Sequence, residues 1–175
     1  LQGKAALQFL RTRHGVGDGS DLARISNQQV FLTSLVRKIK SGGVLTNPVK
    51  LYALANAAAR NMKLSASLTD LNTMVAIAGA LRNVELNKMV FLQVPSHGGL
   101  PAPYAGRVEP NYDQANILFQ MLRDDQPIEL NNSNTGAGAV LASPSPTATP
   151  TPSPTATNGL EGLSGTNAGQ TTCSN

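Results

Sequence analysis

The sequence predicts an α/β fold, mostly helical, followed by a tail without regular structure. Up to about residue 130, apolar residues recur at helical spacing in several segments, and one short apolar run is typical of a strand. After residue 130 the composition changes to Ser, Thr, Pro and Gly, with Glu161 as the single charged residue. We therefore expect an ordered unit over residues 1–130 and a disordered tail over residues 131–175.

The first element is ambiguous in the sequence. "GKAAL" predicts a helical turn, whereas "QFLRTR" is compatible with either a helix or a strand. The alternation of Phe9, Arg11 and Arg13 with Leu10 and Thr12 favours a strand, which would place both arginines on one face. The glycine-rich "HGVGDGS" that follows predicts a loop.

A long helix is expected over residues 21–40, with Ser20 or Asp21 as its N-cap. The Gly42-Gly43 pair ends it. Its apolar positions at helical spacing are Leu22, Ile25, Leu32, Val36 and Ile39.

Three more helices and one strand complete the ordered unit. Pro48 opens a second helix over "VKLYALANAAARNM". A third helix covers "DLNTMVAIAGALRN", capped by Thr69 or Ser67, and a closing helix covers "NYDQANILFQMLRDD", capped by Asn111. Between them, "NKMVFLQVP" predicts a strand buried on both faces.

These strands are too few for a self-sufficient sheet, so we expect the chain to be part of a larger domain. It begins with Leu1, and we expect that a preceding portion was cut away. No apolar run reaches the ~18–20 residues of a membrane-spanning helix. The one cysteine, Cys173, is either unpaired or the partner of a cysteine outside this chain.

Charge is distributed unevenly along the chain. Residues 1–63 hold ten Lys or Arg against two acidic residues, whereas residues 64–175 hold four against eight. The basic half therefore favours an anionic partner, namely phosphate, phospholipid or nucleic acid. Because aromatic residues are not interleaved with the arginines, single-stranded nucleic acid is the least favoured of the three.

The charged residues around the glycine-rich loop indicate a candidate anion site. If Arg11 and Arg13 share a strand face and Asp21 opens the next helix, Arg24 lies one turn in and Gln28 one turn further. A helix N-terminus with converging guanidinium groups suits a pyrophosphate. Asp21 could orient an arginine, cap the helix or accept a proton. The plain alternative is an exposed Asp–Arg ion pair worth under ~1 kcal/mol.

The segment "GKAALQFLRTRHGVGDGSDLARISNQQVFLTSLVRK" resembles the signature of the LytR-CpsA-Psr family. Members carry Gly-x-x-Ala-Leu-x-Tyr/Phe-x-Arg-x-Arg, a variable loop, and then Asp-Phe-x-Arg-x-x-Arg-Gln. The resemblance extends over residues 1 to about 130, with the first thirty residues the specific part. Leu22 replaces the usual Phe, and Asn27 replaces the usual Arg, which removes one positive charge.

The resemblance implies an α-β-α layered domain with a mixed sheet, of which this chain is the C-terminal part. It implies an enzyme anchored in a Gram-positive or actinobacterial membrane that transfers a glycopolymer, on the extracellular face, from a polyprenyl-pyrophosphate carrier to peptidoglycan. It implies a Mg²⁺ ion and a membrane helix, both held by a preceding portion, so that this fragment alone would be inactive. By resemblance, Asp21 and Arg24 are catalytic, and the pyrophosphate ligands are Arg11, Arg13, Arg24 and Gln28.

Two other readings remain open. The first is a non-catalytic module that binds an anionic wall polymer or lipid head groups through Arg37, Lys38, Lys40 and Lys50. The second is a DNA-binding transcriptional attenuator, a label that this family has carried. The lack of a recognition-helix pattern and the Pro-Thr-rich tail disfavour the second reading.

Overall fold

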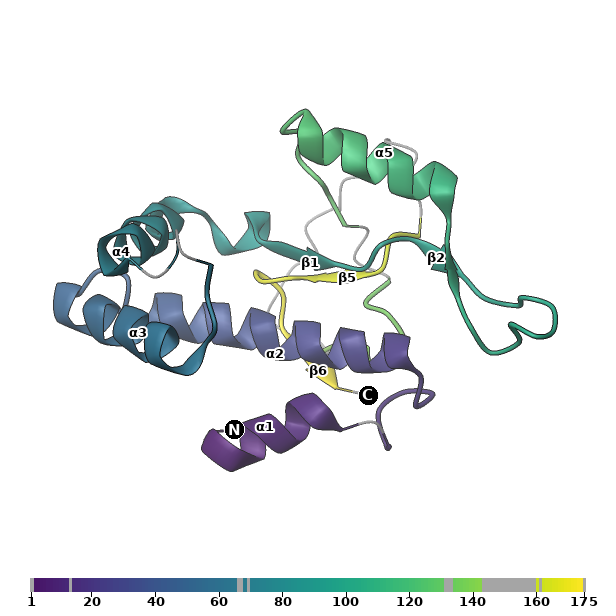
Figure 1. The fold of residues 1–175 in the computed structure, drawn as a ribbon, viewed down its shortest axis with the longest axis horizontal. Coiled ribbons are helices and arrows are strands. Elements are labelled where there is room, and N and C mark those ends of the chain that lie inside the picture. The colour runs from purple at the N-terminus through teal and green to yellow at the C-terminus, as the bar shows by residue number, and fades with distance from the viewer. Residues whose placement is uncertain are drawn as a thin grey trace.

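The computed structural model describes residues 2–12, 14–65, 68, 70–130, 134–142, 160 and 162–174. Across these residues, helices surround small antiparallel strand pairs, so the predicted α/β class is confirmed (Figure 1). The α-helices of this part of the chain are α1 (Gly3–Arg11), α2 (Asp21–Ser41), α3 (Pro48–Asn61), α4 (Leu71–Ala80) and α5 (Tyr112–Arg123).

Helix α2 is the longest element and contacts both larger strand pairs. Ser20 caps it, because its hydroxyl accepts a hydrogen bond from the Ala23 N–H at 3.1 Å. Its buried face differs from the predicted apolar stripe, since Ile25 and Leu32 stay 37% and 40% exposed. The strands lie against small and polar side chains instead, which are Ala23, Ser26, Asn27, Gln29, Val30 and Thr33.

The strand predicted around Arg11 is wrong, because residues 3–11 form helix α1 antiparallel to α2 (Figure 1). Ala6, Phe9 and Leu10 recur at helical spacing, and these are the half-buried residues of α1. Packing of this face on α2 outweighs the two-residue alternation of the sequence. As a result, Arg11 ends a helix and shares no strand face with Arg13, which lies outside the described residues.

The strands pair across long sequence separations. β1 (Val90–Leu92) pairs antiparallel with β5 (Gly165–Asn167), and β4 (Ala139–Leu141) pairs with β6 (Thr172–Ser174). A short hairpin joins β2 (Ser96–His97) to β3 (Glu109–Pro110). β1 is shorter than the predicted strand and is half-buried rather than buried on both faces.

The segment after residue 130 was expected to be disordered throughout, and the structure departs from this at β4, β5 and β6. Leu160 and Leu163 are 6% and 5% exposed, and they pack against Leu118 of α5. Two leucines and the backbone pairing with β1 therefore order the end of the chain, despite its polar composition. Residues 131–133, 143–159, 161 and 175 lie outside the described part.

Local capping signals set the other helices. Asn111 caps α5, as predicted, and Asn47 caps α3 directly before Pro48, the residue expected to open that helix. The cap of α4 is Asp70, not Thr69 or Ser67, and both of those residues lie outside the described part. After α4 the chain forms two 3₁₀ turns, η2 (Leu81–Asn83) and η3 (Leu86–Lys88).

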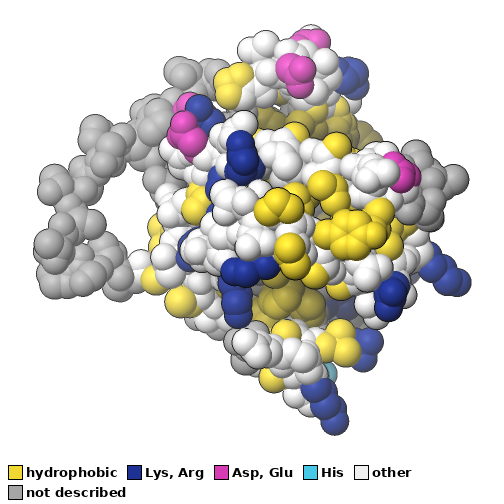
Figure 2. Space-filling view, turned by 90° about the vertical axis from the view of Figure 1, so that its left-hand side faces the viewer, with side chains coloured by type: hydrophobic (Ala, Val, Ile, Leu, Met, Phe, Trp, Pro, Cys, Tyr) yellow, Lys and Arg dark blue, Asp and Glu magenta, His cyan; other side chains and the backbone are white. Residues whose placement is uncertain are grey.

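The α3–α4 pair forms one end of the molecule. Figure 2 shows hydrophobic side chains gathered there beside Lys and Arg. On α3, Val49 and Tyr52 are 78% and 56% exposed. None of the described helices is both long and apolar enough to cross a membrane.

Candidate functional site

The candidate site is built on the loop that joins α1 to α2. Within this loop, Asp18 accepts a hydrogen bond from the Ser20 N–H at 3.0 Å. Hydrogen bonds from the Ser20 side chain and then its backbone hold the pKa of Asp18 below its ordinary value. Gly17 has a φ of 50°, and a Cβ there would lie 2.0 Å from the Ala137 carbonyl oxygen, so only glycine fits. The loop brings the end of α1 beside the start of α2.

Asp21 and Arg24 form an ion pair one helical turn apart. Arg24 Nη2 lies 3.2 Å from Asp21 Oδ1, with the two side chains 32% and 65% exposed. The Nε of Arg24 is buried and has no hydrogen-bond partner within the described structure. Because this Nε has no exposed surface, a ligand would contact Arg24 through the exposed part of its side chain. Asp21 thus orients Arg24 while part of the guanidinium remains available.

Gln28 and Asn27 hold the end of α1 against α2. The Asn27 side-chain amide donates to the Phe9 carbonyl at 3.0 Å, and that of Gln28 donates to the Leu10 carbonyl at 3.4 Å. Both therefore donate to carbonyls in the last turn of α1, of which that of Phe9 also accepts from the Thr12 N–H at 3.3 Å. Sequence reasoning treated Asn27 only as a lost charge and missed this structural role. The pyrophosphate-binding role of Gln28 stays a prediction.

The structure thus gathers Asp21, Arg24 and Gln28 around the α1–α2 turn. Arg11, the last residue of α1, reaches the same turn and is exposed. Arg13 lies outside the described residues, so the predicted convergence of three arginines stays a prediction.

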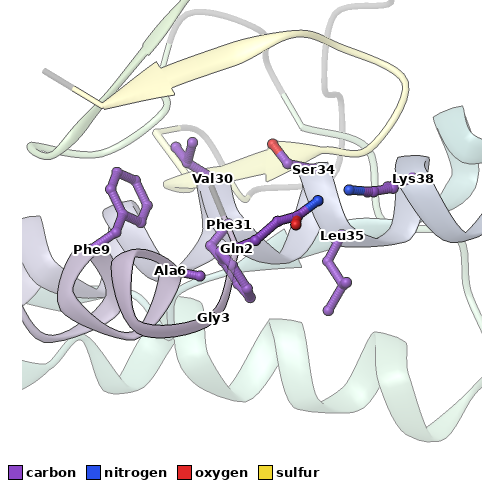
Figure 3. Close-up of a pocket in the computed structure, with 9 residues that line it drawn as sticks. All are labelled: Gln2, Gly3, Ala6, Phe9, Val30, Phe31, Ser34, Leu35 and Lys38. Carbon is purple, nitrogen blue, oxygen red and sulfur yellow. The ribbon is translucent and has the colours of Figure 1, made fainter. Parts of the chain in front are cut away.

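A groove of about 570 Å³ runs between α1 and α2 (Figure 3). At one end, Phe9 lies next to the α1–α2 turn, and its carbonyl is held by Asn27. At the other end lie Gln2 and Lys38 (Figure 3). Sequence reasoning missed this groove because it read α1 as partly a strand. The groove is lined by Gln2, Gly3, Ala6, Phe9, Val30, Phe31, Ser34, Leu35 and Lys38.

The loop before β4 packs closely on the first turns of α2. A Cβ on Gly138 would lie 2.0 Å from the Ala23 carbonyl oxygen, and one on Gly136 would lie 2.2 Å from Ser26 Oγ. The Gln93 side-chain amide also donates to Ser26 Oγ, at 2.9 Å. These contacts fix the start of α2, which carries the Asp21–Arg24 pair.

The described residues offer no group of three or more His, Cys, Asp or Glu side chains that could hold a metal ion. Of the two nearby carboxylates described above, that of Asp18 accepts from Ser20 and that of Asp21 is paired with Arg24. A Mg²⁺ site therefore does not fit the described residues by themselves.

Arg24 precedes Phe31 and Lys38 of the groove by seven and fourteen residues, which places it on the same side of α2, so an oriented arginine and an apolar groove share one helix face. The profile of the LytR_cpsA_psr family matches residues 1–125, and the chain belongs to this family. It is 37% identical over 95 residues to the cell wall biosynthesis protein LcpA of Corynebacterium glutamicum, an alignment covering 54% of this chain and 17% of that protein. The chain thus spans about a sixth of this relative. No solved structure is significantly similar to it.

Proposed function

We propose that this chain forms the lipid-pyrophosphate-binding part of a transferase. The full enzyme would move a glycopolymer from a polyprenyl-pyrophosphate carrier to peptidoglycan on the outer face of the cell membrane. Membership of the family and the similarity to LcpA support a role in cell-wall biosynthesis. The observation that carries the proposal is Arg24, oriented by Asp21 and, by helical periodicity, on the same side of α2 as Phe31 of the groove.

The groove and the ion pair match the two parts of such a carrier. The isoprenoid chain would lie in the groove between Phe9 and Leu35, where burial gains about 25 cal/mol per Å² of apolar surface. The pyrophosphate would lie at the α1–α2 turn, within reach of the Arg24 guanidinium and the Arg11 side chain. Arginine is suited to this because its planar fork binds phosphate oxygens in pairs.

The reaction is a phosphoryl transfer. A hydroxyl oxygen of the acceptor glycan bonds to the glycan-proximal phosphorus, the bond from that phosphorus to the bridging oxygen breaks, and polyprenyl phosphate leaves. Arg24 would neutralise charge on the phosphates, and Asp21 would orient Arg24 or, as a second possibility, accept the hydroxyl proton. Mg²⁺ would add charge neutralisation, with ligands from outside the described residues, and no step is assigned to it. We expect the 175-residue chain alone to be inactive.

The competing proposal is a non-catalytic module with its affinity spread over the basic residues. Arg37, however, donates to the Ala168 carbonyl at 3.1 Å and to the Gln170 carbonyl. Lys40 donates to the Val84 and Arg82 carbonyls, and Lys50 donates to the Gly42 carbonyl at 3.3 Å. These backbone contacts hold the three side chains in place but leave their positive charges unneutralised, so the diffuse basic surface stays the competing proposal.

Binding of a soluble isoprenoid pyrophosphate tests the proposal directly. Titration calorimetry with geranylgeranyl pyrophosphate should give an affinity that Arg24→Ala lowers by about tenfold or more, the loss of one charge-assisted contact. Lys50→Ala serves as the matched control and should leave the affinity unchanged. Equal losses in both variants would favour the diffuse module, and unchanged affinity in Arg24→Ala would refute the role of Arg24.

A further inference from the structure

A second pocket lies in the β2–β3 hairpin, away from the α1–α2 groove. Its volume of about 460 Å³ lies within the ~300–1,000 Å³ typical of small-molecule sites. It shares no lining residue with the groove. The pocket is lined by Leu100, Pro101, Tyr104, Arg107, Val108 and Glu109.

The ring of Tyr104 is the aromatic surface of this pocket, and Arg107 and Glu109 are the polar groups beside it. The Arg107 guanidinium carbon lies 5.9 Å from the centroid of the Tyr104 ring. Tyr104 is 54% exposed, which leaves ring surface open to a ligand. Glu109 Oε1 lies 3.0 Å from His97 Nε2, so this contact holds the carboxylate at the pocket.

The hairpin backbone keeps these groups in place. The Tyr104 N–H donates to the Pro101 carbonyl at 2.9 Å, and the Arg107 N–H donates to the Tyr104 carbonyl at 3.0 Å. At the base, the Asn111 N–H donates to the Pro95 carbonyl at 2.8 Å. A site whose backbone is fixed in this way loses less conformational entropy when it binds a ligand.

A saccharide matches this combination of groups. A sugar ring has an apolar face of C–H groups, which packs on an aromatic ring, and a rim of hydroxyls that both donate and accept. Glu109 can accept from such hydroxyls and Arg107 can donate to them. A highly anionic ligand would be repelled by Glu109, and a purely apolar one would leave both charges unmatched.

The hairpin starts from the first turns of α2. The Gln93 side-chain amide donates to the Leu22 carbonyl at 3.3 Å and to Ser26 Oγ. These two residues lie on the side of α2 turned away from Arg24, because residues two apart on a helix are rotated by about 200°. Ser96 begins β2 three residues after Gln93, about 10 Å of extended chain. A glycan held by the hairpin would therefore lie at the same end of α2 as the α1–α2 turn.

We infer that the Tyr104–Arg107–Glu109 pocket binds one or two sugar units of the acceptor glycan. This rests on the proposed function, in which the acceptor is peptidoglycan. The pocket would hold the acceptor chain at the end of α2 that carries the α1–α2 turn, while the chemistry takes place at that turn.

The test is a titration of the 175-residue chain with the disaccharide of N-acetylglucosamine and N-acetylmuramic acid, followed by NMR. We expect a dissociation constant of roughly 1 mM, which Tyr104→Ala and Glu109→Gln should each weaken about tenfold. Tyr52→Ala is the matched control, because Tyr52 is 56% exposed on α3, and it should bind like the original chain. Since Tyr104 is exposed, its variant should keep the original melting temperature.

Three results would overturn the inference. These are no binding of the disaccharide at 10 mM or so, well above the expected constant; equal affinities in Tyr104→Ala and Tyr52→Ala; or binding of a short acidic peptide in place of the sugar. The two sites can be separated, because Arg24→Ala should lose isoprenoid pyrophosphate and keep the disaccharide. Tyr104→Ala should do the reverse, so failure of the hairpin site would leave the Arg24 proposal standing.

Discussion

The α1–α2 pair differs from the core beneath α5 in the contacts that close it. The α5 core consists of Leu118, Leu160 and Leu163, packed with other leucines, Ile128 and Met121. The α1–α2 pair is closed near its turn by the amides of Asn27 and Gln28, and its apolar side chains line an open groove. Apolar burial therefore stabilises the α5 core, whereas the α1–α2 pair combines partial apolar packing with hydrogen bonds and leaves part of its apolar surface exposed in the groove.

The largest effect should come from the α5 core. Leu118 is 1% exposed, so Leu118→Ala should cost about 2–5 kcal/mol of unfolding free energy, measured by urea denaturation. Leu122 is on the same helix but 54% exposed, and Leu122→Ala should change the stability by less than about 0.5 kcal/mol. Similar losses in both variants would show that α5 has no distinct buried face.

The next effect tests the close contact between the β4 loop and α2. A Cβ on Gly138 would lie 2.0 Å from the Ala23 carbonyl oxygen, so Gly138→Ala should cost about 1–3 kcal/mol. Gly79 in α4 has nothing within 4 Å, and Gly79→Ala should stabilise the chain by about 0.5–1 kcal/mol. Opposite shifts in melting temperature are expected. A neutral Gly138→Ala would mean that the loop does not pack on α2.

A smaller effect is expected at the α1–α2 turn. Asn27→Ala removes the hydrogen bond to the Phe9 carbonyl, which should cost about 1 kcal/mol and loosen α1. Hydrogen exchange should show faster exchange confined to α1, because the α5 core is unaffected. Asn116→Ala on the exposed side of α5 is the control and should leave the exchange of α1 unchanged. Faster exchange in all of the helices would instead show that Asn27 stabilises the whole fold.

The smallest effect is expected at Asp70, the exposed N-cap of α4, which lies outside both regions. Hydrogen bonds from the Thr73 side chain and then its backbone lower the pKa of Asp70 below 3.8. A carboxyl whose pKa is lowered by folding stabilises the folded chain at pH values above the pKa of the unfolded chain. This stabilisation is lost as the pH falls through the pKa of the folded chain. The melting temperatures of the original chain and Asp70→Ala should therefore differ by a few degrees near neutral pH and converge on acidification.

Thr73→Val provides the control for this titration. It removes the 2.8 Å hydrogen bond from the Thr73 hydroxyl to Asp70 Oδ2, so the pKa of Asp70 should rise toward 3.8. NMR titration of the Asp70 carboxyl measures this directly. An unchanged pKa would assign the shift to the backbone hydrogen bonds instead.

The sequence by itself determined the elements whose signals are local. Ser20 and Asn111 cap the helices that they were expected to cap, and α3 begins at Pro48 as expected, because these signals need only the next two or three residues. The Asp21–Arg24 pair is equally local, since a separation of three residues on a helix brings the side chains together.

Only the tertiary structure decided the features that depend on distant partners. Residues 3–11 satisfied both a helical and a strand pattern, and packing on α2 selected the helix. Residues 165–167 and 172–174 form strands because β1 and β4 supply backbone partners, and Leu118 gives Leu160 and Leu163 a surface to bury against. The Arg37 side chain donates to the carbonyl of Ala168, 131 residues away in the sequence. Local propensity carries no information about such partners, so these contacts, and the groove that they leave open, follow from the fold alone.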